Sequence, residues 1–257
     1  MEKKFTARTF LKYKLSAKSR HHVHSPFVYD LLDNVINDNS PFYGYELVEA
    51  LRANNLLDES EVSIADYGTG EDRKEKISQI AGKSVMAKKY SQLLFRLINK
   101  FQPVHILEIG TSLGLTTIYL SLASSKSKVI TLEGSEEIGK IALKNFSSLK
   151  RNNIELIIGE FDYGINQAIS KTKNFDFVLF DGNHTQDATL SYFGKCLAHA
   201  NENSVFVFDD IHWSREMENA WHQIKQHPSV STSIDLFQIG IIFFRKGMSR
   251  EQFVLKF

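Results

Sequence analysis

Acidic side chains occur where short apolar runs of this sequence end. Glu108 lies near the end of one run and is followed by Gly110, and Glu133 ends the next run and is followed by Gly134. A carboxylate at such a point can accept hydrogen bonds from the two hydroxyls of a ribose, and a glycine lets the backbone approach a ligand closely. These residues therefore predict a site for a small molecule that carries a ribose.

A second group of polar residues follows two later apolar runs. Asp181 and His184 follow the run over 177–181, and Asp209-Asp210 follow the run over 204–208. Three carboxylates buried together are costly unless a cation neutralises them, and hard oxygen ligands in modest number suit Mg²⁺. An imidazole can accept a proton near neutral pH. We therefore expect Asp181, Asp209 and Asp210 to hold a metal and His184, with Asp181, to serve catalysis.

The elements that must position these residues alternate regularly after Pro103. Apolar stretches of strand length occur at 104–109, 128–132, 154–158, 177–181 and 204–208, and helical patterns occur near 113–123, 135–150, 163–171, 186–199 and 214–226. This alternation predicts a parallel sheet covered on both faces. The last two runs, 230–237 and 240–245, are joined by a short turn and must pair antiparallel. The expected fold is α/β, a Rossmann-like seven-stranded sheet that ends in an antiparallel hairpin.

The first part of the chain has a different pattern and predicts a helical extension over residues 1–83, ahead of a catalytic domain over 84–257. Ser25 as N-cap and Pro26 at the first helical position predict the start of one helix, and 45–56 and 86–100 predict two more. The segment 64–70 is expected to form a glycine turn. This extension could close over the active site as a lid.

The turn over residues 105–117 is the most specific motif. Its glycines, Gly110 and Gly114, have the spacing G-x-x-x-G rather than the G-x-G-x-x-G of dinucleotide-binding folds. With Glu133 on the next strand, this turn resembles motif I and the following acidic motif of class I S-adenosylmethionine-dependent methyltransferases. The resemblance covers roughly residues 84–245. It implies a cofactor held by the following residues: Glu108, Gly110, Thr111, Ser112, Gly114, Thr116, Glu133, Gly134 and Asp181. For the adenine contact, Glu160 or Asp162 could accept from its amino group, or Phe161 could stack on it.

The later strand ends resemble those of metal-dependent small-molecule O-methyltransferases of the catechol and macrocin types. The pair Asp209-Asp210 matches the macrocin type, and His184 stands where the catechol type has a lysine base. Asn183 stands where the macrocin type has an acid, and an amide cannot act as a base, so the identity of the base stays open. Other roles are also open: Asp181 could only orient the cofactor amine, and the aspartate pair could cap the next helix, for which Ser214 is the better candidate. His212 is expected to be a satisfied surface histidine, and Trp213 either walls the acceptor pocket or packs against the next helix.

Charge and composition narrow the class of partner. The net charge is +1, although residues 1–24 hold seven Lys and Arg against one Glu, so the rest of the chain is negative, about −5. We expect a small-molecule acceptor, no nucleic acid and no membrane, with a homodimer possible in principle. The single cysteine, Cys196, excludes an internal disulfide and favours the cytoplasm. The expected function is metal-assisted methyl transfer to a hydroxyl oxygen. Two alternatives are a methyltransferase that acts on a macromolecule and a non-catalytic cofactor-binding protein.

Overall fold

The computed structural model describes residues 2–64, 73–247 and 249–257. The predicted glycine turn over 64–70 lies almost wholly outside these residues. The chain forms two compact units, which we call the middle unit (39–172) and the terminal unit (1–38 with 173–257). The predicted boundary at residue 84 does not coincide with this division and stays a prediction.

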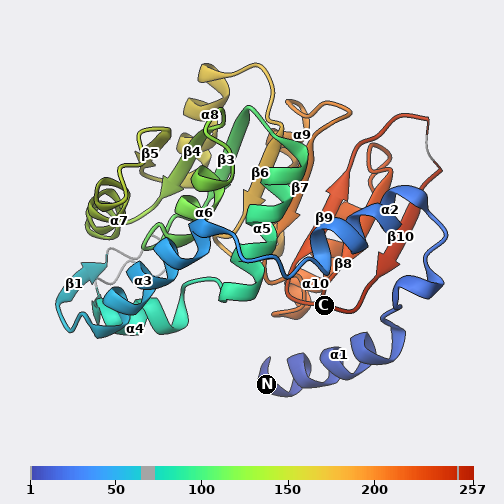
Figure 1. The fold of residues 1–257 in the computed structure, drawn as a ribbon, viewed down its shortest axis with the longest axis horizontal. Coiled ribbons are helices and arrows are strands. Elements are labelled where there is room, and N and C mark those ends of the chain that lie inside the picture. Colours follow the sequence, from blue (N-terminus) through green and yellow to red (C-terminus); the bar gives the residue numbers. More distant parts are fainter. Residues whose placement is uncertain (1, 65–72, 248) are drawn as a thin grey trace. The chain divides into compact units, whose positions relative to one another are not determined.

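The middle unit contains three parallel strands side by side in the order β3, β4 and β5 (Figure 1). These strands are β3 (His105–Ile109), β4 (Lys128–Glu133) and β5 (Ile154–Ile158). Three helices connect or follow them: α6 (Leu115–Ala123), α7 (Glu136–Ser148) and α8 (Phe161–Lys171). All six elements agree with the sequence prediction within two residues at each end, because the strands are largely apolar and the helices are amphipathic.

The middle unit also contains helices and a hairpin that precede β3. The helices are α3 (Tyr43–Leu57), α4 (Ile77–Lys83) and α5 (Lys88–Phe101). The strands β1 (Glu61–Ile64) and β2 (Arg73–Lys76) pair antiparallel and were not predicted, since β2 consists entirely of charged residues. The helix α5 has a sharply amphipathic sequence and buries Leu93, Leu94 and Leu97 in the core of the unit.

The terminal unit pairs its strands in the order β10, β8, β9, β7 and β6. The bounds are β6 (Phe177–Phe180), β7 (Val205–Phe208), β8 (Thr232–Asp235), β9 (Gly240–Phe243) and β10 (Glu251–Val254). The pair β6 and β7 is parallel, whereas β9 runs antiparallel to both β7 and β8. The predicted C-terminal hairpin is therefore confirmed, and β10, which pairs parallel with β8, adds a strand to the seven expected.

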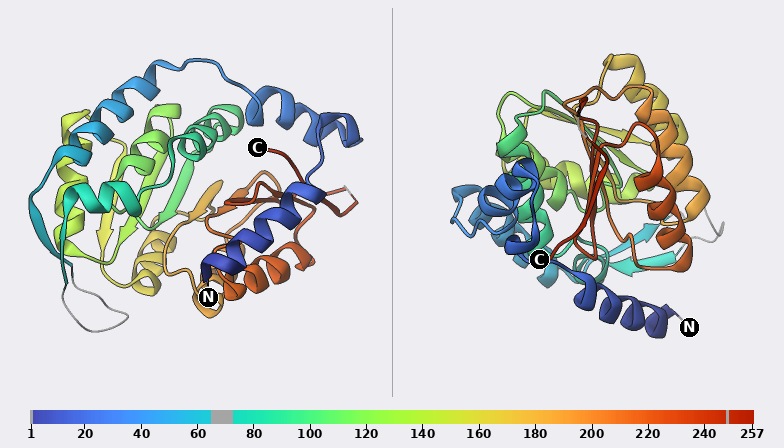
Figure 2. Two further views of the ribbon diagram at one scale, coloured as in Figure 1. Left: turned by 90° about the horizontal axis from the view of Figure 1, so that it is seen from below. Right: turned by 90° about the vertical axis from the view of Figure 1, so that its right-hand side faces the viewer.

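Helices of the terminal unit come from both ends of the chain (Figure 2). They are α1 (Glu2–Ser16), the 3₁₀ turn η1 (Arg20–His22), α2 (Pro26–Leu31) with the π-helical turn η2 (Leu32–Ile36), α9 (Gln186–Leu197) and α10 (Arg215–Gln226). The helix α2 begins at Pro26 as predicted, but the buried hydroxyl of Ser25 makes no capping hydrogen bond. Ser214 does cap α10, because its hydroxyl accepts a hydrogen bond from the backbone N–H of Met217 at 3.1 Å.

Candidate functional site

The turn between β3 and α6 is held by backbone contacts with the end of β4. The N–H groups of Gly110 and Thr111 both donate to the carbonyl of Leu132, at 3.1 and 3.0 Å. Gly110 has φ 107°, Ser112 has φ 49° and Gly114 has φ 77°, so three residues of the turn lie in the left-handed region that favours glycine. The turn thus presents backbone at the carboxyl end of β3, where ligands of α/β sheets bind.

Gly114 is required by packing as well as by conformation. Its φ is 77°, and a Cβ atom at this position would lie 2.4 Å from Cε1 of Phe146 in α7. The close neighbour of Gly114 is therefore the helix α7. The side chain of Asn145 in α7 donates to the carbonyl of Leu113 at 2.8 Å and fixes the same contact.

Glu133 connects the turn to the end of β4. Its Oε2 accepts from the N–H of Ser112 at 2.8 Å, and its Oε1 accepts from the N–H of Ser135 at 3.0 Å. Burial raises the pKa of Glu133, and the backbone hydrogen bonds, including one from Gly134, oppose that shift. The position of Glu133 fits the predicted contact with ribose.

Glu108 is fully buried rather than exposed at the strand end. Its Oε2 accepts hydrogen bonds from Thr117 and, at 2.6 Å, from Thr131, whose hydroxyl oxygen lies 2.6 Å from that of Thr111. Burial raises the pKa of Glu108 to about 7. Glu108 therefore holds the turn indirectly, through the hydroxyl groups of threonine side chains. A direct contact of Glu108 with the cofactor stays a prediction. The sequence analysis did not predict a role for Thr131. A hydroxyl residue inside an otherwise apolar strand could have indicated a buried polar contact.

The remaining predicted cofactor residues of the middle unit lie at element ends. Thr116 is buried in the first turn of α6, at 6% exposure. Glu160 is the N-cap residue of α8 and is exposed, and Phe161 is half-buried at the first helical position. Asp162 is exposed in the same turn of α8. The role of each in binding adenine stays a prediction.

In the terminal unit, the structure brings the four polar residues after β6 and β7 into one cluster. Nε2 of His184 lies 3.7 Å from Oδ1 of Asp181, and the side chain of Asp181 is hydrogen-bonded to Asp209. The charges of His184 and Asp210 also interact. The turn that returns His184 toward Asp181 passes through Asn183, which has φ 51°. The four side chains predicted to act together are thus neighbours in this unit.

Burial dominates the electrostatics of this cluster. Asp209 is 4% exposed, and burial together with the neighbouring charge of Asp210 raises its pKa to about 7. The pKa of Asp210 is also raised by burial, whereas burial lowers the pKa of His184. Within the described residues, Oδ1 of Asp209 is buried and has no hydrogen-bond partner. An unpartnered buried carboxylate oxygen is costly, and it is free to bind a donor or a cation.

The carboxylates are not arranged as a complete metal centre. In the parts of the chain that the structure describes, no three or more His, Cys, Asp or Glu side chains are grouped so that they could hold a metal ion. The predicted metal is therefore not confirmed. The donor chemistry of Asp181, Asp209 and Asp210 and the unpartnered oxygen of Asp209 nevertheless fit a hard cation.

Two further residues after β7 differ from expectation. His212 is not a surface residue: its side chain is 12% exposed, its Nε2 lies 2.8 Å from Oδ2 of Asp235, and its ring stacks on Phe237. Trp213 is 52% exposed and does not pack in the core, a place taken by Trp221. Sequence reasoning could not connect His212 with Asp235, because the two are 23 residues apart and belong to different elements.

Comparison with known proteins agrees with this description. A family model described as a methyltransferase domain matches residues 107–211, which include the glycine turn and the aspartate pair. This part of the chain is therefore similar to a methyltransferase domain. The predicted resemblance to methyltransferases is thereby confirmed for residues 107–211, and a search of curated proteins finds no match to this chain.

Solved structures show the same fold at low sequence identity. The O-methyltransferase of Bacillus cereus in complex with S-adenosylhomocysteine (SAH) is 21% identical, with a TM-score of 0.59 over 84% of this chain and 95% of that one. The SAH-bound methyltransferase PaMTH1 of Podospora anserina is 14% identical, with a TM-score of 0.60 over 87% and 98%. The O-methyltransferase TomG of Streptomyces achromogenes, in complex with S-adenosylmethionine and involved in tomaymycin synthesis, is 17% identical, with a TM-score of 0.58 over 85% and 95%. In the described parts of this chain, no helix is long and apolar enough to cross a membrane.

Proposed function

We propose that this methyltransferase transfers a methyl group from S-adenosylmethionine to a hydroxyl oxygen of a small molecule, with assistance from a divalent cation. The observation that carries the proposal is the cluster of Asp181, His184, Asp209 and Asp210 after β6 and β7 of a methyltransferase fold. The O-methyltransferases among the structural neighbours, two of which bind the donor or its product, support oxygen as the acceptor atom.

The residues of the middle unit fit the donor. Glu133 lies at the end of β4, where it can meet the ribose hydroxyls, and the turn around Gly110 offers a close backbone approach. Glu108 and Thr131 hold that turn through hydroxyl groups. When bound, S-adenosylmethionine supplies an electrophilic methyl group on a positively charged sulfur.

The cluster of the terminal unit supplies proton transfer. As the acceptor oxygen bonds to the methyl carbon, the carbon–sulfur bond breaks, its electron pair stays on sulfur, and the hydroxyl proton must leave. His184 is kept neutral by burial and can take that proton at a ring nitrogen, and Asp210 then stabilises the imidazolium. Asp181 lies 3.7 Å from His184 and orients the ring. The residues that would hold Mg²⁺ are Asp181, Asp209 and Asp210, and the cation would lower the pKa of a bound hydroxyl.

The experiment that tests the proposal is an acceptor screen with radiolabelled S-adenosylmethionine and a panel of hydroxylated small molecules, in Mg²⁺ and in EDTA. We expect Mg²⁺-dependent transfer that Asp209→Asn reduces by about tenfold or more without loss of SAH affinity, because a carboxylate ligand is lost. Asp187→Asn is the matched control, since Asp187 is exposed in the first turn of α9. Full activity in EDTA, with no ion found by elemental analysis, would exclude the cation, and transfer to nitrogen acceptors alone would exclude the O-methyl assignment.

A further inference from the structure

A groove between α1 and α10 in the terminal unit has a charge pattern that the methyl-transfer proposal does not use. Figure 2 shows the two helices side by side. The groove encloses about 330 Å³. Three cations line it: Arg8 and Lys12, one helical turn apart on α1, and Arg215 at the first position of α10. Two basic residues of the N-terminal segment, Arg8 and Lys12, therefore line a cavity.

These cations have no carboxylate partner in the described residues. Arg215 makes only a cation–π contact, with its Cζ 5.9 Å from the centroid of the Phe5 ring. The groove contains one acid, Glu218, and its Oε1 lies 3.8 Å from Nδ1 of His212 instead. The lining thus carries a net charge of +2. Like charges gathered without a counter-ion repel each other, and a bound anion would relieve that repulsion.

Two uncharged polar residues add possible donors to the groove. Thr9 on α1 lines it and is 6% exposed. Its hydroxyl can donate to a ligand that carries acceptor oxygens. Asn219 on α10 adds an amide that can donate from the other wall.

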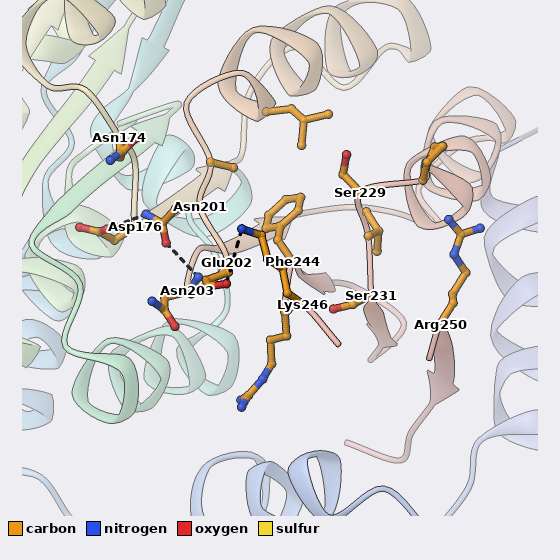
Figure 3. A pocket seen from close by; sticks show the side chains of 15 residues that line it. Asn174, Asp176, Asn201, Glu202, Asn203, Ser229, Ser231, Phe244, Lys246 and Arg250 are labelled. Atoms are coloured by element: carbon orange, nitrogen blue, oxygen red, sulfur yellow. Dashed lines mark hydrogen bonds and ion pairs between the residues drawn. The ribbon is translucent and has the colours of Figure 1, made fainter. Parts of the chain in front are cut away.

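In a second cavity of the same unit, charged and polar side chains are paired with one another or with backbone carbonyls (Figure 3). It encloses about 1130 Å³ and is also lined by basic residues. There, however, Lys246 lies 3.8 Å from Glu202, and Arg250 donates to the carbonyl of His227 at 2.7 Å. Asn201 in turn donates to Asp176 at 3.3 Å. Because these groups pair among themselves, that cavity does not call for an anion.

We propose that the groove between α1 and α10 binds a phosphate group, carried either by a soluble phosphorylated molecule or by a phospholipid headgroup. Arginine binds phosphate oxygens in a bidentate manner, lysine adds a point charge, and Thr9 and Asn219 complete a set of donors around a tetrahedral anion. The volume suits a phosphate with a small attached group. Leu11 and Leu15 are 61% and 82% exposed on α1, which gives the lipid source a specific test.

The test is calorimetric titration of the full chain with inorganic phosphate and with glycerol 3-phosphate at low ionic strength. We expect saturable binding that Arg215→Gln and Arg8→Gln each weaken by about fivefold or more, because a charge-assisted hydrogen bond is lost. Thr9→Val keeps the shape of the side chain and should weaken binding as well. Lys14→Gln is the control: it removes the same charge from the same helix, but Lys14 lies over the Phe10 ring and does not line the groove. Circular dichroism confirms that each variant is folded.

Two further titrations distinguish the sources of the phosphate. Vesicles of phosphatidylcholine with and without phosphatidic acid test the lipid, and Leu11→Ser should abolish binding to the vesicles while it leaves glycerol 3-phosphate binding unchanged. Binding of glycerol 3-phosphate without binding to vesicles assigns a soluble ligand. The proposal is overturned if neither phosphate binds with saturation, or if Lys14→Gln weakens binding as much as Arg215→Gln does.

Discussion

The backbone N–H of Ser112 donates to Oε2 of Glu133 at 2.8 Å, so the acidic end of β4 holds the glycine turn after β3. The same carboxylate accepts from Ser135 through its other oxygen. One side chain therefore holds the backbone of two turns. The contact explains in physical terms why an acid at this strand end belongs to the same site as the glycine turn.

Glu133→Gln should weaken SAH binding by about tenfold or more. The amide keeps the volume of the side chain, but its NH₂ group cannot accept the hydrogen bond of a backbone N–H or a ribose hydroxyl, and hydrogen bonds to a charged acceptor are the stronger ones. Isothermal titration with SAH measures the change. Glu136→Gln is the matched control, because Glu136 is exposed in the first turn of α7. Equal affinity of the Glu133→Gln variant and the wild type would remove Glu133 from the site.

Gly114→Ala should lower the free energy of unfolding by about 2 kcal/mol or more. A residue with a Cβ is strained by about 1–2 kcal/mol in the left-handed region, and here the Cβ would also lie 2.4 Å from Phe146. Urea denaturation gives the value. Gly194→Ala in α9 is the control, since nothing lies within 4 Å of a Cβ there, and it should stabilise the helix by roughly 0.5–1 kcal/mol. If both variants behave alike, Gly114 is not a packing constraint.

The stability of this protein should depend on pH through Glu108. The pKa of Glu108 is raised from 4.5 to about 7 by burial. Between these values the folded state binds more protons than the unfolded state, so this contribution to stability is present at low pH and is lost as pH rises through 7. Glu108→Gln removes the ionisation. The free energy of unfolding of this variant, minus that of the wild type, should therefore increase between pH 5 and pH 8, by an amount on the order of 1–3 kcal/mol. Denaturation at a series of pH values measures this difference, and a difference independent of pH would contradict the assignment.

His184→Gln should lower kcat by about 100-fold with little change in the KM for S-adenosylmethionine, as expected when a general base is lost. His222→Gln is the control, because His222 is exposed on α10. A purely structural role would move stability and KM as well. Added imidazole should restore part of the activity of His184→Gly, because the free base can occupy the space of the missing ring. Near-normal turnover of the His184→Gln variant would assign the proton to another group.

The sequence by itself determined the elements that repeat locally. The strands β3, β4, β6 and β7 are largely apolar runs because most of their residues are buried, and β5 is a short run rich in Ile and Leu. The helices between them have a helical period, so each element was recognisable without its neighbours. The same alternation predicts which residues lie at strand ends, because each strand ends where its apolar run ends. It therefore placed the glycine turn, Glu133 and the aspartates.

Only the tertiary structure decided which partners these residues have. Glu108 and Glu133 both lie near strand ends, yet Glu108 is buried against Thr117 and Thr131 while Glu133 holds backbone N–H groups of two turns. β10 pairs with β8 although nothing in its composition distinguishes it from a loop. The contact between His212 and Asp235 and the groove between α1 and α10 join residues far apart in the chain. Such contacts depend on long-range packing. A local sequence pattern does not predict which residues lie across a sheet or on a neighbouring helix.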